Sequence, residues 1–370
     1  MTAGGLEIGS GLPVPLLSLP ACVVAGAATV ANARPASPRC GRVGRRRTRT
    51  VEGREAQEGH TVSATVAVLG PGGVGGLLAG LLARAGHRVV CLAGDDTAGA
   101  LRKDGITVHS SVHGDFTTPV EADTVLRETP DVVLVTVKQT ALASALDRVP
   151  PALARPGTVI VPLLNGVEHM DLLRERYPDA HVVGATIRVE STRTAPGVID
   201  HGTPFTVLRL ACAVPEPAAL AELAESLRSG GAEVVVGGDE KAALWDKLAV
   251  LAPFALLTTD FGTPVGEVRT THRQLMLGVV EEVTAVARAA GATVTTDAVV
   301  AFFDTVPETM KSSMQRDVEA AQPTELDAIG GAVLRAAERH GVPVPGTTAL
   351  VERLRGREQL RGRERLRGRE

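Results

Sequence analysis

Short apolar, β-branched runs alternate with stretches of helical spacing between residues 64 and 164. We expect helices over 73–86 and 140–147, and strands over 64–70, 88–92, 131–137 and 158–164. Apolar strands that alternate with helices are typical of an α/β fold, in which a doubly wound parallel sheet carries helices on both faces. Further strand-like runs should extend or flank this sheet, at 181–190, 197–200, 205–210 and 233–236.

The hydrophobic period becomes helical from about Asp239 onward, in segments such as 240–259 and 274–291. We therefore predict an α/β domain over 63–237 and an all-helical C-terminal domain over 238–353. Ligands of doubly wound sheets bind at the carboxyl ends of the strands, and small molecules favour clefts between domains. The active site is expected where the two domains meet.

The two ends of the chain lack such patterns. Residues 1–62 join a Pro-interrupted apolar stretch to an Arg-rich run, and Glu7 is the only charge before the apolar part. A secretory signal needs a positive start and an unbroken apolar core, so we expect a disordered extension instead. Residues 354–370 repeat LRGRE with a period of six, which matches neither a heptad nor a helical turn. This segment is predicted to be a solvated, low-complexity tail.

Residues 64–76, ATVAVLGPGGVGG, lead from a predicted strand through a glycine-rich turn into a predicted helix. The glycines stand in the G-x-G-x-x-G register, which closes a tight turn and lets the backbone approach a pyrophosphate at the helix N-terminus. In this context the dinucleotide-binding interpretation is favoured over a plain strand-to-helix turn, and the sheet is predicted to be of Rossmann type. The predicted cofactor-binding residues of the turn are Gly70, Pro71, Gly72, Gly73, Val74 and Gly75.

Composition and charge narrow the function classes. The formal net charge is -3, and the Arg-rich stretches lie only at the two ends, so nothing favours nucleic acid or an anionic membrane as partner. The cysteines show neither C-x-x-C pairs nor metal-ligand spacing, which argues against a metal site and for a reducing, cytoplasmic setting; they are Cys22, Cys40, Cys91 and Cys212.

Lysine is rare in this chain: five of the 39 basic residues are Lys. A Lys can lose its proton near neutral pH when buried, whereas an Arg cannot. Lys247 lies in the apolar segment WDKLAV, beside the only Trp, and is a candidate proton donor to a carbonyl that accepts hydride. The alternative is a helix Lys whose stem packs on the core while its ammonium stays in water.

Several motifs in order resemble the ketopantoate reductase (2-dehydropantoate 2-reductase) family, from about residue 64 to 350. They are GPGGVG, TVKQT, LLNGVEH, APGVIDHG, WDKLAV, SSMQRD, TELDAIGG and VPVPGTTALVERL. The resemblance implies reduction of a 2-oxo acid with NADPH, with Lys247 as the proton donor. It also implies that Lys138, Asn165 and Glu325 contact the cofactor, and that Asn165 and Ser313 contact the substrate.

Each of these residues also has a simpler interpretation. Lys138 follows a strand and could be a surface residue, and Asn165 could serve only the Asn-Gly turn. Ser313 could be a polar loop residue. Glu325 could favour the dipole of a first helical turn, which Pro323 and Thr324 would open.

The chain departs from the family at positions that usually contact the substrate. Leu251 and Ala255 stand four and eight residues after Lys247, on the same helix face, where the family usually has Asn. Val265 stands at a third such position. A pocket without polar partners cannot favour a substrate hydroxyl, so a more apolar 2-oxo acid or ketone is an alternative substrate.

The cofactor preference also stays open between NADPH and NADH. Members of the family commonly place an Arg after the second strand, where this chain has Gly94 followed by Asp95 and Asp96. An acid about 20 residues past the last glycine usually binds the ribose of NAD and repels a 2′-phosphate. Arg102 and Lys103 are candidates to compensate.

The function we predict is NADPH-dependent reduction of 2-dehydropantoate to pantoate, in pantothenate biosynthesis. A dinucleotide-binding sensor without catalysis is the alternative from another class, although a sensor needs neither Lys247 nor Glu325. The expected partner is a small-molecule 2-oxo acid, and the apolar helical domain is compatible with a homodimer.

Overall fold

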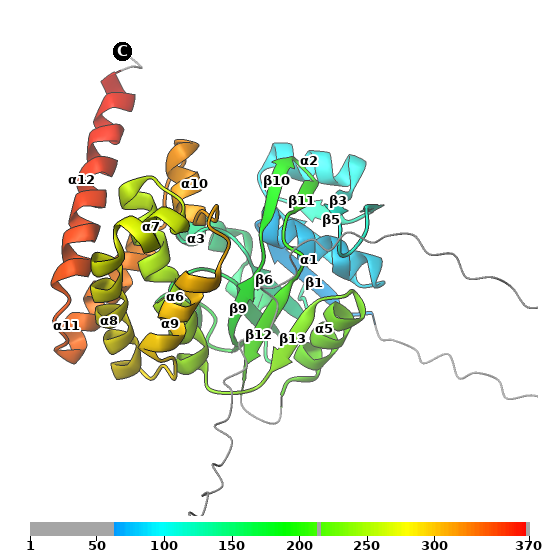
Figure 1. Ribbon diagram of the computed structural model, residues 1–370. Helices are drawn as coiled ribbons and strands as arrows, with labels where there is room; N and C mark the ends of the chain where they lie inside the picture. Colours follow the sequence, from blue (N-terminus) through cyan, green and yellow to red (C-terminus); the bar gives the residue numbers. More distant parts are fainter. Residues whose placement is uncertain (1–62, 213–215, 368–370) are drawn as a thin grey trace, which may run out of the picture. The chain divides into compact units, whose positions relative to one another are not determined.

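The α/β part of the protein is built on one parallel sheet. The computed structural model describes residues 63–212 and 216–367, and the extension predicted over 1–62 lies outside them. Six strands, all parallel to their neighbours, pair in the order β5-β2-β1-β6-β7-β8. They span Thr65–Leu69 (β1), Arg88–Leu92 (β2), Glu121–Asp123 (β5), Val132–Val135 (β6), Val159–Pro162 (β7) and His181–Val182 (β8). The predicted Rossmann-type sheet is confirmed (Figure 1).

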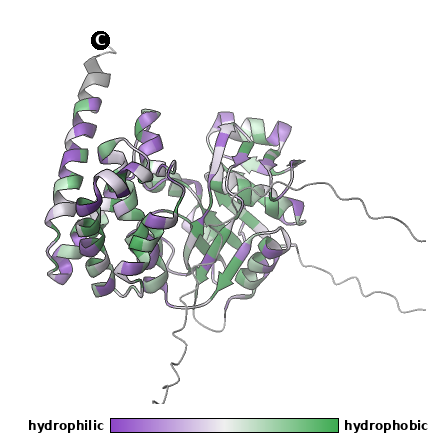
Figure 2. Ribbon diagram, in the orientation of Figure 1, coloured by the Kyte–Doolittle hydropathy of each residue, from purple (hydrophilic) through white to green (hydrophobic). Residues whose placement is uncertain are grey.

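Both faces of this sheet are buried. Successive side chains of a strand point to opposite faces, so each strand contributes to two cores. Val66 and Val68 of β1 join the core formed with helices α1 (Gly73–Arg84) and α5 (Ala218–Ser229). Ala67 and Leu69 join a second core on the other face, with Tyr177 and the short helix α3 (Leu142–Ala145). The hydropathy colouring shows the strands as the most apolar part of this half (Figure 2).

Two smaller sheets and three helices complete the α/β part. One sheet has the order β10-β11-β3-β4, over Ser191–Ala195, Val198–His201, Ile106–Ser110 and Phe116–Thr118. The other has the order β13-β12-β9, over Glu233–Val236, Val207–Ala211 and Gly184–Arg188. Helices α2 (Asp95–Asp104), α4 (His169–Arg176) and α5 were not among the predicted elements, nor were strands β3, β4, β5 and β10.

The helix predicted over 140–147 is broken into three short turns. A 3₁₀ turn over Gln139–Ala141 leads into α3, and another follows over Leu146–Arg148. The residue before a proline avoids the helical region, and Val149 stands before Pro150 with an extended ψ of 90°. The helical segment therefore ends before Pro150, and a further 3₁₀ turn covers Pro151–Leu153.

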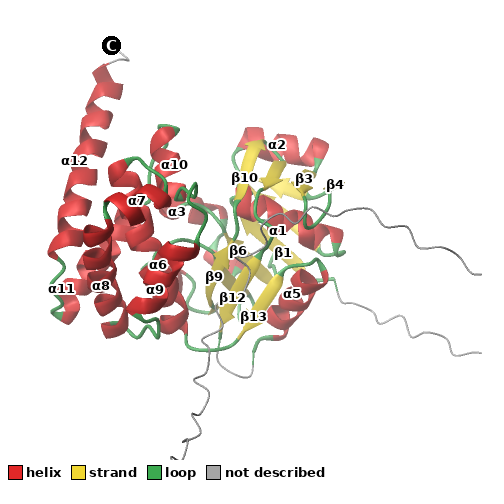
Figure 3. Cartoon of the chain, viewed as in Figure 1, coloured by secondary structure: helices red, strands yellow, loops and turns green. Residues whose placement is uncertain are grey.

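From the end of β13 to residue 367, the last that the structure describes, all elements are helical (Figure 3). They are α6 (Glu240–Phe261), α7 (Val265–Thr271), α8 (Arg273–Ala289), α9 (Thr296–Thr305), α10 (Ser313–Glu319), a π-helical turn (Asp327–Gly331), α11 (Ala332–His340) and α12 (Pro345–Arg367). Helix α6 begins at an Asp239 cap that accepts the Ala242 N–H at 2.8 Å. It is long and apolar enough to cross a membrane, but 78% of its most apolar window is buried inside the protein, as expected of a core helix.

The predicted solvated tail is wrong for the first part of 354–370. Helix α12 runs through the expected boundary, and Leu354 is buried in the helical core. Arg353 forms an ion pair of 2.7 Å with Asp260 of α6, and Arg357 donates to the Asp260 carbonyl at 2.6 Å. Residues four apart share a helix face, so Arg353 and, from the Arg-rich repeat, Arg357 are both partners of this buried carboxylate.

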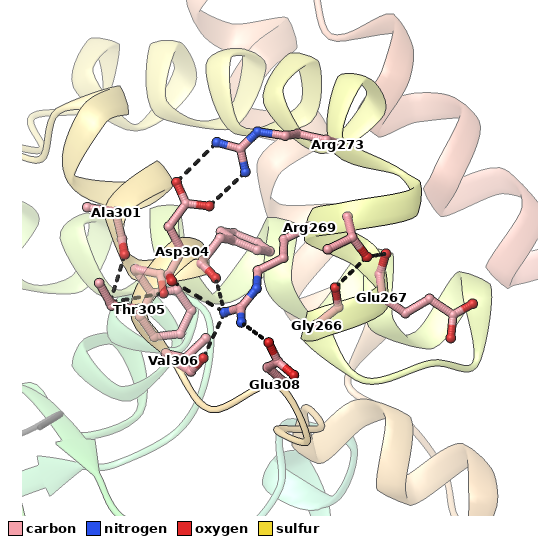
Figure 4. Close-up of polar contacts among 12 residues, drawn as sticks. Gly266, Glu267, Arg269, Arg273, Ala301, Asp304, Thr305, Val306 and Glu308 are labelled. Carbon is pink, nitrogen blue, oxygen red and sulfur yellow. Dashed lines mark hydrogen bonds and ion pairs between the residues drawn. The ribbon is translucent and has the colours of Figure 1, made fainter. Parts of the chain in front are cut away.

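Arg269 of α7 fixes the loop that leads to α10 (Figure 4). Its guanidinium donates to the carbonyls of Phe303 at 3.0 Å and Val306 at 2.9 Å, at the end of α9. The same group pairs with Glu308 at 3.0 Å. Carbonyls at a helix end lack intrahelical partners, so the partly buried Arg269 holds both α9 and the loop after it.

Candidate active site

In the glycine turn after β1, Gly72 is the glycine that has room for a side chain, whereas Gly70, Gly73 and Gly75 do not. Gly70 has a φ of +87°, which favours glycine, and its N–H donates to the Leu92 carbonyl at 3.1 Å. A Cβ at Gly73 would overlap the Ser191 backbone, and one at Gly75 would overlap the Gly70 carbonyl and Thr136. At Gly72 the nearest atom to such a Cβ is the Gly70 oxygen, 3.9 Å away.

This turn fits a dinucleotide. Gly72 is the N-cap of α1 and supplies no side-chain cap, so the first N–H groups of the helix, which have no partner within 63–212 and 216–367, can bind an anion. Pro71 is buried and Val74 packs against the core of the sheet, so these two residues support the turn from its protein side. The residues present therefore suit a pyrophosphate, with its closest approach at Gly72.

Thr136, which the sequence did not single out, ties the ends of two strands together beside this turn. Its hydroxyl lies 3.0 Å from the Leu69 carbonyl and 2.8 Å from the Gly70 carbonyl. A Thr at the end of an apolar strand gives no signal by itself, because many strands end in a polar residue. Here it holds the glycine turn against β6.

Glu325 connects the helical domain with the ends of β6 and β7, which precede the predicted site residues Lys138 and Asn165. Its side chain is buried, and one carboxylate oxygen accepts the Asn165 amide at 2.9 Å. The other oxygen accepts the Gln139 N–H, also at 2.9 Å. Glu325 precedes the helix that starts at Leu326, so its carboxylate is used by these two donors and not by a first helical turn.

Lys138 makes a second connection between the domains. Its ammonium pairs with Asp317 of α10 at 2.7 Å, and 45% of the Lys138 side chain is exposed. The structure thus places it at the end of β6, as predicted, but engaged with the helical domain. A role toward the cofactor stays a prediction.

Lys247 lies on α6 and is partly buried. Within residues 63–212 and 216–367, its ammonium has no hydrogen bond and no ion pair. Burial lowers the pKa of Lys247 to about 8, and the nearby charge of Glu325 opposes this shift. An amine with this pKa is protonated at neutral pH and releases its proton easily, as a general acid requires.

His169, in the first turn of α4, is a further residue near Lys247 that the sequence did not single out. It is 1% exposed, and neither ring nitrogen has a partner among the described residues. Burial, and then the charge of Lys247, lower the pKa of His169 to about 4, so the ring is neutral. Its helix is tied to α6 by the pair of Arg174 and Glu240 at 2.7 Å. A single His in a helix is usually a packed core residue, so the sequence alone did not indicate a role for His169.

The predicted substrate residues are in contrasting surroundings. Ser313 is exposed at the start of α10, whereas the preceding Ser312 is buried and accepts the Thr258 hydroxyl at 2.8 Å. Leu251, one turn after Lys247, is partly exposed. Ala255 and Val265 are fully buried in the helical core. Leu251 is therefore the accessible one of these three positions, because Ala255 and Val265 are covered by the helical core.

The cationic residues proposed to compensate for Gly94 point elsewhere. Arg102 and Lys103 lie in the last turn of α2, while Gly94 precedes its first turn. The Arg102 guanidinium donates to the Ala122 carbonyl at 3.0 Å, and Lys103 contacts Asp104 at 3.7 Å. Arg102 is thus engaged by a backbone carbonyl of β5, and Lys103 is exposed beside Asp104 at the far end of α2 from Gly94.

Comparison with known proteins gives the same family as the motifs. A family model described as "Ketopantoate reductase PanE/ApbA" matches residues 66–209, and the model of its C-terminal part matches residues 239–358. The 2-dehydropantoate 2-reductase of Halobacterium salinarum is 32% identical over 311 residues, covering 78% of this chain and 97% of that protein. The enzyme of that name from Mycobacterium tuberculosis is 32% identical over 301 residues, covering 78% and 96%.

A solved structure agrees. The PanE/ApbA family ketopantoate reductase from Ralstonia eutropha JMP134 superposes with a TM-score of 0.72 and 29% identity, over 80% of this chain and 99% of that one. The fold and the site thus define an oxidoreductase that uses a nicotinamide dinucleotide. The chain belongs to the ketopantoate reductase family.

Proposed function

We propose that the protein reduces 2-dehydropantoate to pantoate with NADPH, and that Lys247 is the proton donor. The observation that carries this proposal is the ammonium of Lys247, which has no partner among the described residues and whose pKa is lowered to about 8 near the Glu325 carboxylate. An ammonium without an internal partner is available to a substrate oxygen. The expected setting is pantothenate biosynthesis in the cytoplasm.

The residues of this chain divide the work as follows. The turn at Gly72 and the N-terminus of α1 hold the pyrophosphate, and the reduced nicotinamide supplies the hydride when bound. As the carbonyl carbon accepts hydride, the Lys247 ammonium gives a proton to the carbonyl oxygen, which becomes the product hydroxyl. Lys247 is left as a neutral amine and regains its proton from water.

The neighbours of Lys247 position the reactants. Glu325 holds the Asn165 amide, whose remaining acceptor is then free for the cofactor or the substrate. Ser313 is exposed at the start of α10 and is proposed to donate to the substrate carboxylate. Lys138 supports this arrangement by joining β6 to α10.

A second candidate function is reduction of a more apolar 2-oxo acid or ketone. It is favoured by the partly exposed Leu251, one helical turn after Lys247. Ala255 does not add to this argument because it is fully buried. Replacement of Leu251 by Asn should then raise activity on 2-dehydropantoate, and no rise would remove this explanation.

The test is oxidation of NADPH and NADH by the full-length protein with 2-dehydropantoate and with a panel of other 2-oxo acids and ketones. We expect turnover with 2-dehydropantoate. Turnover with only a bulkier, apolar substrate would favour the second candidate. Tight cofactor binding without turnover of any compound in the panel would contradict both.

A further inference from the structure

We propose that Arg148 binds the 2′-phosphate of NADPH and so gives this chain its preference for the phosphorylated cofactor. This inference rests on the proposed function for the use of a dinucleotide. It assigns the phosphate contact to a residue far from Gly94 in sequence, in the 3₁₀ turn Leu146–Arg148.

Two hydrogen bonds fix the guanidinium at the carboxyl edge of the sheet. Its Nη1 donates to the Ala93 carbonyl at 2.8 Å and to the Thr124 carbonyl at 2.8 Å. Ala93 is the first residue after β2, and Thr124 is the first residue after β5. Arg148 therefore bridges the ends of two neighbouring parallel strands, and its position is set by backbone atoms.

The end of the second strand is where a Rossmann-type sheet distinguishes the two cofactors. The ribose of the adenosine lies there, and either an acid binds its 2′-hydroxyl or an Arg binds its 2′-phosphate. The backbone of Ala93 and Gly94 forms this position in the present chain, and Gly94 carries no side chain that could fill the space. The only cation that the described residues bond to the Ala93 carbonyl is Arg148.

The guanidinium still has donors to offer. Of its nitrogens, only Nη1 has a partner among the described residues, so Nε and Nη2 stay available. A planar fork with two such nitrogens, which carry three N–H groups, matches a phosphate better than a point charge does. Asp95 and Asp96 oppose an anion, but both are exposed, and water and salt screen exposed charges more than a partly buried one.

Arg102 offers a matched control. It too is an Arg near the edge strand β5, and it too donates through Nη1 to a backbone carbonyl, that of Ala122 at 3.0 Å. However, Ala122 lies inside β5 and not beyond its end. Loss of Arg102 should therefore cost a similar structural contact without removing a cation from the ribose position.

The experiment is calorimetric titration of full-length protein with adenosine 2′,5′-bisphosphate and with AMP, which differ by the 2′-phosphate and need no turnover. We expect Arg148→Gln to weaken the bisphosphate about 10- to 100-fold, the effect of losing hydrogen bonds to a charged group, and to change AMP binding less than about threefold. Arg102→Gln should change neither, and Arg148→Lys should fall between wild type and Arg148→Gln.

Three results would overturn the assignment. They are equal binding of the two nucleotides by wild type, equal loss of both in Arg148→Gln, and an unchanged bisphosphate affinity in that variant. Thermal unfolding of each variant checks that it is folded. If Arg148→Gln does not fold, the same comparison is made with Arg148→Lys. Because no substrate is present, a failed assignment here is distinct from failure of the proposed reduction.

Discussion

Asn165 and Glu325 are separated by 160 positions in the chain, yet the Asn165 amide nitrogen lies 2.9 Å from a Glu325 carboxylate oxygen. The second oxygen binds the Gln139 N–H at 2.9 Å, and the same charge acts on Lys247. One buried carboxylate thus joins the ends of β6 and β7 to the segment before the helix that starts at Leu326, and its charge reaches Lys247 on α6.

Replacement of Glu325 by Gln removes this charge and leaves one acceptor oxygen for two donors. Because Glu325 raises the pKa of Lys247, the variant should have a Lys247 pKa below the wild-type value of about 8. We expect the alkaline fall of kcat/KM to begin at lower pH, and kcat/KM itself to drop about 10- to 100-fold. The pH profile of the variant checks this, and a profile at the wild-type position would show that Glu325 does not act on Lys247.

Two adjacent glycines should respond differently to Ala. A Cβ at Gly72 would make only an ordinary contact, 3.9 Å from the Gly70 oxygen, so Gly72→Ala should keep the thermal stability of wild type while weakening dinucleotide binding. Gly73→Ala would press its Cβ into the Ser191 backbone and should destabilise the fold by about 1–3 kcal/mol. Thermal unfolding with cofactor titration separates the two effects. Equal affinity in wild type and Gly72→Ala would place the pyrophosphate elsewhere.

Arg269→Gln should destabilise the helical domain, since the guanidinium donates to carbonyls at the end of α9 (Figure 4). Hydrogen bonds from charged groups contribute about 1.5–3 kcal/mol, so a loss of about 2 kcal/mol in the free energy of unfolding is expected. Arg273→Gln is the control, because its pair with Asp304 is about 40% exposed on both sides and should contribute less than about 1 kcal/mol. Urea unfolding measures both, and equal effects would argue against the role given to Arg269.

The docked part of α12 gives a further prediction. The Asp260 side chain is 3% exposed, and Arg353 and Arg357 are its ion-pair partners. Changing both to Met leaves a buried carboxylate without a counter-charge, which costs about 3–5 kcal/mol. Arg355→Met, which breaks an exposed contact with Asp327, should cost less than about 1 kcal/mol. If the double variant unfolds at the same urea concentration as wild type, the tail contributes nothing to the fold.

The sequence predicted the sheet well because strands buried on both faces form unbroken apolar runs, as in β1, β6 and β7. It missed short or half-exposed elements, such as β4, β5 and α2, whose polar residues hide the period. The prediction of a solvated tail was wrong for another reason. Its Arg residues look solvated in isolation, and their partner Asp260 lies about 90 positions earlier in the chain.

Residue types and motifs also identified Lys247, Asn165 and Glu325 before their contacts were known. No local pattern could predict that the Glu325 carboxylate binds at two strand ends, or that His169 lies near Lys247 with no partner in the described part of the chain. Both depend on contacts between distant segments. The same dependence on distant contacts applies to the position after β2. Its sequence neighbours Arg102 and Lys103 were the predicted cations there, whereas the guanidinium that binds the Ala93 carbonyl belongs to Arg148.

The most direct test of the central claim is the pH dependence of 2-oxo acid reduction by wild type and by Lys247→Ala. The proton donor must be protonated, so wild-type kcat/KM should be level below about pH 8 and fall above it, following the pKa of Lys247. Lys247→Ala should lose about 100- to 10,000-fold in turnover with cofactor affinity retained. Turnover near the wild-type rate in Lys247→Ala, with the same alkaline fall, would contradict the account.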